Sequence, residues 1–375
     1  MSFSQYRETV SMVKKSDYID SSIVSIHQLF EQKVVCSPCS VAVEFKTDSF
    51  TYGQLNNIAN QIAKELIFKG VKAGDRIGVL SKRSHHTVAS ILGVLKSGAA
   101  YVPIDGSYHD ELIEFICNDG DISGVVTTTD SYSAVPEGLK AFTVVADLMD
   151  SMVESDNLDL NLDIDRPVLL IYTSGSTGKP KGALHCEREQ LVRINWLLNE
   201  YPFKVGEIVG QRSNIGFIPS VWELLGGLLG GVKTVIIPDE IIKDPEALGD
   251  LVLECSISRL SFVPYLLKTV LSSRKENIQK FSALKWISIA GAPLPIDLYL
   301  ELREVVPRAI ILNEYGTTEA NGITFFDTSR LVRGQTKTVP IGKAIPGVEL
   351  YIFDDDMALV SEGGVGRLYV SKRST

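Results

Sequence analysis

The sequence predicts an α/β fold: two doubly wound, mostly parallel sheets with helices (a layered sandwich), followed by a small β-barrel-like piece. Three observations support this class. Short apolar runs alternate with helical periodicity through most of the chain, which is typical of parallel sheets covered by helices. Past residue 322, short strands follow Gly/Pro turns without helices between them. The 375 residues, 45% of them hydrophobic, are ample for a large core.

The first half of the chain alternates regularly. Apolar residues recur at helical spacing over 53–69, which predicts an amphipathic helix. Four strands are expected: Arg76–Leu80, Tyr101–Ile104, Gly124–Thr128 and Phe142–Val145. Helices are also expected over 86–97 and 110–118, between the first three of these strands. The stretch 129–165 is otherwise loop-rich and acidic, so we expect it to be a solvated connector.

The alternation resumes after a buried strand at Pro167–Ile171. The expected elements are, in order, helix 188–199, helix 221–230, strand Thr234–Ile237, helix 245–255, strand Leu260–Val263, helix 265–272, strand Trp286–Ala290, helix 295–305 and strand Ile310–Asn313, then the short strands Ile323–Phe326, Glu349–Phe353 and Arg367–Ser371. We therefore expect a polar leader over 1–22, α/β sub-domains over 23–165 and 166–320, and a β-rich part over 321–375.

Composition excludes several classes of function. The net charge of −9 is spread over short patches, and no basic run suggests nucleic acid or an anionic membrane surface. No apolar stretch reaches the roughly 18 residues that span a bilayer, and the polar N-terminus carries no signal-peptide core. Five cysteines fit a reducing compartment, so a cytoplasmic protein is expected. Cys36 and Cys39 have metal-knuckle spacing, but no second Cys/His pair completes a site.

The most informative segment is the loop after the strand Pro167–Ile171. It reads Tyr172-Thr173-Ser174-Gly175-Ser176-Thr177-Gly178-Lys179-Pro180-Lys181-Gly182. Its glycines let backbone N–H groups approach an anion, its hydroxyls donate hydrogen bonds, and its lysines neutralise negative charge. The spacing differs from the ordinary P-loop. These residue types after a buried strand predict a loop that holds phosphate groups.

This loop resembles the nucleotide-phosphate loop of the adenylate-forming superfamily, which includes acyl-CoA synthetases, luciferases and adenylation domains of nonribosomal peptide synthetases. Other segments resemble further motifs of the family in the same order: Phe50–Leu55, Leu95–Asp105, Phe217–Glu223, Asn313–Glu319, Pro340–Lys343 and Gly366–Val370. The resemblance covers about residues 23–375, and the second motif, Leu95–Asp105, favours the peptide-synthetase branch.

The resemblance implies that a carboxylic acid is activated with ATP and Mg²⁺ to an acyl-adenylate, which then passes to the phosphopantetheine thiol of a carrier protein. It implies an ATP site at Thr173, Ser174, Gly175, Ser176, Thr177, Gly178, Lys181, Gly291, Ala292, Pro293, Asn313, Tyr315, Gly316 and Thr318. Catalytic roles fall to Lys181, Thr318 and Glu319, and Glu319 would hold the metal through its hard oxygens. The chain departs from the family pattern at Ala290–Ala292 and at Thr317, without loss of a chemically essential group.

The substrate pocket implied by the resemblance consists of Phe217, Ile218, Pro219, Trp222, Ser261, Ser288, Ala290, Glu314, Gly322 and Ile323. Amino-acid-activating relatives have an aspartate where this chain has Ile218. An α-ammonium buried against isoleucine would be left unpaired at a cost of several kcal/mol. We therefore expect an α-keto, α-hydroxy, β-amino or other carboxylic acid, with aryl acids ranked lower. Glu314, the only charged member, either receives a displaced amino group or faces away.

Two other functions stay open at this point. A stand-alone acyl-CoA or aryl-acid ligase would use CoA as acceptor, and a non-catalytic pseudo-adenylation module would scaffold an assembly line. In the family, a ribose-binding Asp motif, a hinge and a small subdomain with a catalytic lysine follow the Gly366–Val370 motif. We therefore expect residues 1–375 to be the large N-terminal subdomain, poorly active alone.

Overall fold

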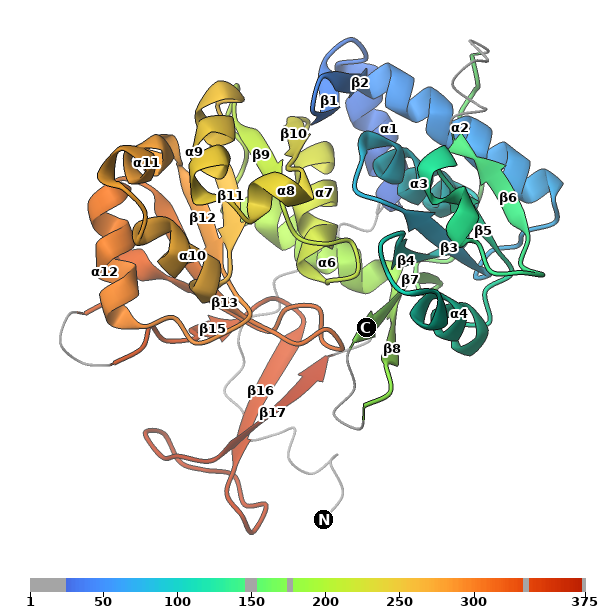
Figure 1. The fold of residues 1–375 in the computed structure, drawn as a ribbon. Coiled ribbons are helices and arrows are strands. Elements are labelled where there is room, and N and C mark those ends of the chain that lie inside the picture. Colours follow the sequence, from blue (N-terminus) through green and yellow to red (C-terminus); the bar gives the residue numbers. More distant parts are fainter. Residues whose placement is uncertain (1–24, 146–153, 174–177, 333–336, 373–375) are drawn as a thin grey trace.

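The structure, a computed structural model, describes residues 25–145, 154–173, 178–332 and 337–372 (Figure 1). It confirms the expected α/β class: two mostly parallel sheets lie side by side, with helices between them and on their outer faces. The expected leader over 1–22 lies outside the described residues. No helix among the described residues is long and apolar enough to cross a membrane.

The smaller sheet has six strands and carries the glycine-rich loop. In spatial order its strands are β6 (Ala141–Val144), β5 (Gly124–Thr127), β3 (Arg76–Ser81), β4 (Ala100–Asp105), β7 (Pro167–Thr173) and β8 (Lys181–Cys186). All neighbours are parallel except β7 and β8, which form an antiparallel hairpin at the edge. The strand β8 was not expected from the sequence.

The larger sheet has nine strands. Their spatial order is β15 (Lys343–Ala344), β14 (Thr324–Asp327), β13 (Ile310–Tyr315), β12 (Trp286–Ile289), β11 (Arg259–Phe262), β9 (Ile208–Gln211), β10 (Lys233–Ile236), β1 (Val41–Phe45) and β2 (Asp48–Thr51). The run from β13 to β1 is parallel, whereas β2, β14 and β15 pair antiparallel at the two edges.

The expected division at residues 165 and 166 does not follow the sheets. Strands β1 and β2 precede it but belong to the larger sheet, and the β7–β8 hairpin follows it but belongs to the smaller one. The C-terminal part is likewise shared, since β14 and β15 extend the larger sheet. The expected small β-rich piece is confirmed as antiparallel but is not barrel-like: β16 (Val348–Phe353) pairs with β17 (Arg367–Lys372) in a two-stranded sheet among the described residues.

A layer of helices fills the space between the sheets and forms one apolar core with both. These helices are α1 (Ile26–Cys36), α2 (Tyr52–Phe68), α3 (His85–Lys96), α6 (Glu187–Glu200) and α7 (Pro219–Leu229). Helix α2 begins in a capping box between Thr51 and Gln54. Helices α2 and α3 pack closely because residue 93 is a glycine. A Cβ added at Gly93 would lie 2.5 Å from Ile62 Cγ2.

The outer faces of the sheets are covered separately. Helix α4 (Asp110–Asp119) packs on the smaller sheet. The larger sheet is covered by α9 (Pro245–Glu254), α10 (Pro264–Leu271) and α12 (Ile296–Val305), next to the short helices α8 (Asp239–Ile242) and α11 (Lys275–Gln279) (Figure 1). Three 3₁₀ turns complete the described elements: Thr129–Ala134, Lys280–Ala283 and Thr328–Arg330. The result is a five-layer arrangement of helices and sheets.

Acid is expected to destabilise the fold through His27 on α1. Burial lowers the pKa of His27 to about 3, and the nearby charges of Lys96 and Arg166 act in the same direction. Its ring lies 2.8 Å from Ser25 Oγ. Because the unfolded chain takes up the proton near pH 6.5 and the folded chain does not, stability is lost as pH falls from about 6.5 toward 3. The loss reaches at most about 1.4 kcal/mol per pH unit.

The check is urea unfolding of the parent and His27→Gln at pH 7 and pH 5. The substitution should reduce the difference between the two pH values, while His85, whose pKa burial lowers to about 4, leaves a residual dependence in both proteins. An equal loss of stability in the two proteins would show that His27 takes up its proton without unfolding.

Candidate active site

The glycine-rich loop closes the β7–β8 hairpin at the edge of the smaller sheet. Thr173 and Lys181 are cross-strand partners, so the residues between them form the tip. Gly178 is exposed and has φ +86°, a left-handed conformation that favours glycine. The predicted phosphate ligands Ser174, Gly175, Ser176 and Thr177 lie outside the described residues. The hairpin therefore positions Lys181, also exposed, at the root of the loop.

Glu319 belongs to the segment that follows β13 of the larger sheet, and its side chain is exposed. Hydrogen bonds from its own backbone N–H and from the Thr317 hydroxyl lower the pKa of Glu319, and the nearby charge of Lys181 acts in the same direction. Glu319 is thus held ionised and lies within electrostatic reach of Lys181. Candidate phosphate-binding and metal-binding residues therefore meet where the edges of the two sheets approach each other.

The residues expected near the adenine ring follow two adjacent strands. Gly291, Ala292 and Pro293 are exposed and follow β12 after Ala290, whereas Tyr315 ends the neighbouring β13 and Gly316 comes directly after it. Carboxyl ends of parallel strands form the usual ligand-binding edge of such sheets. A Cβ at Gly316 would lie 2.7 Å from Gly322 Cα, so a larger residue would push apart these two chain segments.

Asn313 has a structural role in this conformation. Its side-chain amide donates to the carbonyls of Val339 at 3.1 Å and Pro340 at 2.9 Å. Both amide protons therefore tie β13 to the Pro340–Lys343 motif. The Asn313 side chain is buried, whereas Tyr315, Gly316, Thr317 and Glu319 of the Asn313–Glu319 motif are exposed.

The predicted acid-pocket residues come from α7 and from the ends of β11, β12 and β13. Pro219 begins α7, and the preceding Ile218 is buried at 7% exposure, whereas Phe217 is 62% exposed. Trp222 and Ile218 are four residues apart, so they share one face at the start of the helix. Ile323 is buried and its N–H donates to the carbonyl of Tyr315. Ser261 and Ala290 are half-buried.

Glu314 faces inward and has protein partners. It is buried and accepts a hydrogen bond from Ser288 Oγ at 2.7 Å. It also pairs with Arg193, a buried residue of α6. Neither expectation for Glu314 describes this arrangement, because its carboxylate neither faces away nor is left free for an amino group. Sequence reasoning missed Arg193, whose partner lies 121 positions away in the chain.

Arg193 lies between two tryptophans at the pocket wall. Its guanidinium carbon is 4.6 Å from the ring centroid of Trp196 and 4.7 Å from that of Trp222. A desolvated guanidinium stacked on aromatic faces is stabilised by cation–π attraction. The residue thus contacts two members of the predicted pocket, Trp222 and Glu314, and an added Cβ at a third, Gly322, would lie 3.3 Å from its Nε.

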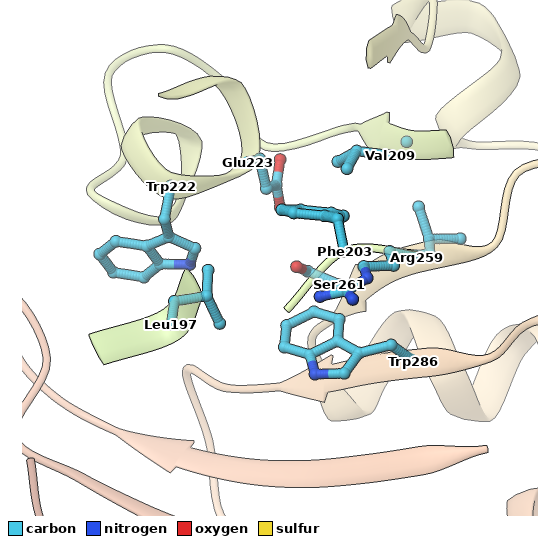
Figure 2. Close-up of a pocket in the computed structure, with 10 residues that line it drawn as sticks. Leu197, Phe203, Val209, Trp222, Glu223, Arg259, Ser261 and Trp286 are labelled. Carbon is cyan, nitrogen blue, oxygen red and sulfur yellow. The ribbon is translucent and has the colours of Figure 1, made fainter. Parts of the chain in front are cut away.

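Trp222 and Ser261 also border an internal cavity of about 20 Å³ (Figure 2). This volume holds about one water molecule and no acid substrate. A second arginine, Arg259, lies in its wall with its guanidinium carbon 3.9 Å from the ring centroid of Phe203. The cavity therefore belongs to the packing behind the predicted pocket.

The loop that leads into the substrate motif is fixed from both sheets. The buried Glu223 accepts hydrogen bonds from the backbone N–H groups of Arg212 at 3.0 Å and Ser213 at 2.8 Å. Arg212 Nε donates to the carbonyl of Ser261 in β11 of the larger sheet at 2.7 Å, and Asn214 donates to Asp105, which ends β4 of the smaller sheet. The chain on the N-terminal side of Ile218 is therefore anchored to both sheets, which fixes the start of α7.

The residues present fit a hard divalent cation bound together with phosphate. No group of three or more His, Cys, Asp or Glu side chains suited to a metal occurs in the described part of the chain. Mg²⁺, however, is commonly bound by one or two carboxylates together with the phosphates of a nucleotide. The ionised, exposed Glu319 is a suitable single carboxylate.

Comparisons with known proteins identify a family and several relatives of this chain. The family model for AMP-binding enzymes matches residues 30–375. The chain is 34% identical over 340 residues to one of the subunits of mycosubtilin synthase from Bacillus subtilis, covering 88% of this chain and 13% of that protein. It is 30% identical over 357 residues to zwittermicin A synthase ZmaJ of Bacillus cereus, covering 92% of this chain and 67% of that protein.

Solved structures share the fold. An AMPPNP-bound form of the nonribosomal peptide synthetase FmoA3 superposes with a TM-score of 0.85 at 23% identity, over 94% of this chain and 38% of that one. The Klebsiella oxytoca NpsA N-terminal subdomain with 3-hydroxybenzoyl-AMSN gives 0.79 at 21% identity, over 93% of this chain and 85% of that one. The motifs, the two-sheet fold and the family match together show that the chain belongs to the AMP-binding enzyme family, which confirms the resemblance seen in its sequence.

Proposed function

We propose that this chain takes part in the ATP-dependent activation of a small carboxylic acid as its acyl-adenylate. The observation that carries the proposal is the ionised Glu319 within electrostatic reach of Lys181, next to the glycine-rich hairpin. Joining a carboxylate to the α-phosphate of ATP brings two anions together, so catalysis depends on positioning and charge neutralisation. Lysine and a carboxylate-bound cation are suited to this.

The roles of the individual residues are those that the family resemblance implies. Thr173, Lys181 and the loop between them would bind the β- and γ-phosphates, and Thr318 would donate to the α-phosphate. Glu319 would hold Mg²⁺, which supplies charge neutralisation at the phosphates. Tyr315 and the segment Gly291–Pro293 would lie against the adenine ring. FmoA3, which shares the fold, is described with bound AMPPNP, and that supports a nucleotide at this edge.

The acid is expected to lack an α-amino group in the usual place. Ile218 is buried and supplies no carboxylate, and the nearest acidic pocket residue, Glu314, is already paired with Arg193 and Ser288. An ammonium in this pocket would be desolvated without a counter-charge. This supports an α-keto acid, an α-hydroxy acid or another carboxylic acid without an ammonium group as substrate, and it counts against the β-amino acids that were also expected from the sequence.

A carrier-protein thiol is the proposed acceptor, because FmoA3, which shares the fold, is described as a nonribosomal peptide synthetase. A stand-alone CoA ligase and a non-catalytic module are the alternatives. The deciding experiment is ATP–pyrophosphate exchange by the protein with a panel of acids, followed by addition of CoA or of a phosphopantetheinylated carrier protein. No exchange and no ATP binding would refute the proposed adenylation; release of acyl-CoA would favour the ligase.

Replacing Ile218 with aspartate should shift acid selection toward α-amino acids. A carboxylate at this position would supply the counter-charge that an α-ammonium lacks, so exchange with α-amino acids should rise by about tenfold or more. The matched control is Ile215→Asp, because Ile215 has the same 7% exposure on the same loop. If neither variant gains any amino acid, or both gain equally, the pocket assignment of Ile218 is incorrect.

A further inference from the structure

The described part of the chain contains three deeply buried Arg–Glu pairs: Arg166–Glu187, Arg259–Glu207 and Arg193–Glu314. In the first two pairs, every guanidinium nitrogen of the arginine has a hydrogen-bond acceptor in the protein. Arg259 donates from Nε to Glu207 at 2.8 Å, and from its two terminal nitrogens to the carbonyls of Tyr201 and Pro202. Arginines of this kind support the fold and offer nothing to a ligand.

Arg166 follows the same pattern. Its Nε donates to the carbonyl of Gly98 at 3.2 Å, and its terminal nitrogens bond to Glu187 and to the carbonyls of Leu95 and Asp163. Each nitrogen of this guanidinium therefore has an acceptor, as expected for a charged group away from water.

Arg193 differs from both. One terminal nitrogen pairs with Glu314, but its buried Nε–H has no hydrogen-bond partner. The side chain is only 2% exposed, so water does not provide an easy substitute. An unsatisfied donor in such a place costs about 1–3 kcal/mol, and proteins retain few of them. This donor therefore calls for an acceptor that the protein itself does not provide.

The position of this donor is informative. A Cβ on Gly322 would lie 3.3 Å from Arg193 Nε, closer than an ordinary contact, so the glycine backbone packs directly beside the donor. Trp222 forms one wall, with its ring centroid 4.7 Å from the guanidinium carbon. Gly322, Trp222 and Glu314 all belong to the acid pocket predicted from the sequence. The unused N–H thus lies among the residues expected to surround the substrate.

Neighbouring residues show the same shortage of partners. Gln190, one helical turn before Arg193, has a buried side chain whose amide nitrogen and oxygen are both without partners. Asn321, next to Gly322, is fully buried with both polar side-chain atoms unpartnered. A concentration of unsatisfied polar groups around one spot marks a place that a polar ligand would complete.

We propose that Arg193 determines acid selectivity: its Nε–H donates to a neutral acceptor oxygen on the substrate, as carried by a 2-oxo or 2-hydroxy acid. The pair with Glu314 cancels the charge of Arg193, so a neutral oxygen is a better match than a second carboxylate. An ammonium at the same position offers no acceptor and meets a donor. Amino-acid-activating relatives have an aspartate, a hydrogen-bond acceptor, at the position of Ile218. In this chain that acceptor is missing, and Arg193 supplies a hydrogen-bond donor instead. This inference rests on the proposed function.

The test uses non-hydrolysable acyl-sulfamoyl adenosines that share one carbon skeleton and differ at the α-carbon: isovaleryl, 2-hydroxyisovaleryl, 2-oxoisovaleryl and valyl. A three-carbon series (propionyl, lactoyl, pyruvoyl and alanyl) covers a smaller pocket. Binding is measured by calorimetry on the 375-residue chain. The N-terminal subdomain of NpsA is described in complex with 3-hydroxybenzoyl-AMSN. The readout is a ratio of affinities and needs no turnover.

In the parent protein, the 2-hydroxy or 2-oxo analogue of at least one series should bind about ten- to a hundredfold more tightly than the analogue with hydrogen at that carbon. Arg193→Lys keeps the charge beside Glu314 but removes the Nε–H donor, and it should reduce this ratio toward one. The matched control, Arg259→Lys, removes the same donor from a stacked and paired arginine and should keep the ratio.

Each outcome decides something. Equal affinities within both series for the parent protein would overturn the inference and leave the proposed function standing, as would a ratio that survives in Arg193→Lys. Tightest binding of the valyl or alanyl analogue would also overturn it. If no analogue and no ATP binds, the proposed function fails and the inference with it. Because the ratio in the parent protein is itself a test, the inference stays falsifiable even if Arg193→Lys does not fold.

Discussion

Replacing Glu314 with alanine is expected to lower the free energy of unfolding by about 3–5 kcal/mol. Arg193 is 2% exposed and its guanidinium is enclosed by Trp196 and Trp222. Without Glu314 it would be a buried cation with no counter-charge, and Ser288 would lose the acceptor of its hydroxyl. The penalty reflects the charge left behind more than the loss of attraction within the pair. Urea unfolding at pH 7 measures it directly.

Two controls separate this explanation from simple truncation. The double variant Glu314→Leu with Arg193→Leu removes both charges and should recover most of the lost stability, since apolar replacements of buried pairs are often neutral. Glu240→Ala breaks a surface ion pair in which the side chain of Glu240 is 66% exposed and that of Lys46 is 54% exposed. This substitution should change the free energy of unfolding by about 1 kcal/mol or less. A double variant as unstable as Glu314→Ala would argue against an unpaired Arg193 as the cause.

The sequence predicted the regular elements well because their signals are local. The amphipathic pattern over 53–69 became α2, within one residue at each end, and the apolar run at Pro167–Ile171 became β7. The strands β1, β2, β8, β9 and β15 were missed. They are short and partly polar: β8, for example, alternates exposed Lys181, Gly182 and Leu184 with buried Ala183 and His185. Pairing with neighbouring strands, which no local pattern reports, makes them strands.

The site was predictable only where a motif carries the chemistry. Lys181 and Glu319 follow from motifs, and in the structure Lys181 is near enough to contribute to the lowered pKa of Glu319. Arg193 could not be found in this way, because a charged residue on an amphipathic helix usually faces solvent. Its burial depends on Trp196 from its own helix, Trp222 from α7 and Glu314 from β13. Three separate elements create the environment that turns this arginine from a surface residue into part of the pocket.

Replacing Glu319 with glutamine is expected to reduce adenylate formation by about two to three orders of magnitude, the range found when a single group that stabilises transition-state charge is removed. Glutamine keeps the size and one oxygen but loses the negative charge that hydrogen bonds from its own N–H and Thr317 hold in the ionised form. A hard cation binds a neutral amide oxygen more weakly than a carboxylate. The variant should therefore also need more Mg²⁺ to reach half of its maximal rate.

The measurement is ATP–pyrophosphate exchange at rising Mg²⁺ concentration, on the same protein preparation as the parent. Glu301→Gln is the matched control, because Glu301 is an exposed carboxylate on α12 and should leave both the rate and its Mg²⁺ dependence unchanged. A lower rate with an unchanged Mg²⁺ dependence would mean that Glu319 acts by positioning Thr317 and Lys181, and not as the ligand of the metal. An unchanged rate would remove Glu319 from the proposed mechanism altogether, because no other carboxylate of the Asn313–Glu319 motif is exposed: Glu314 is buried and paired with Arg193.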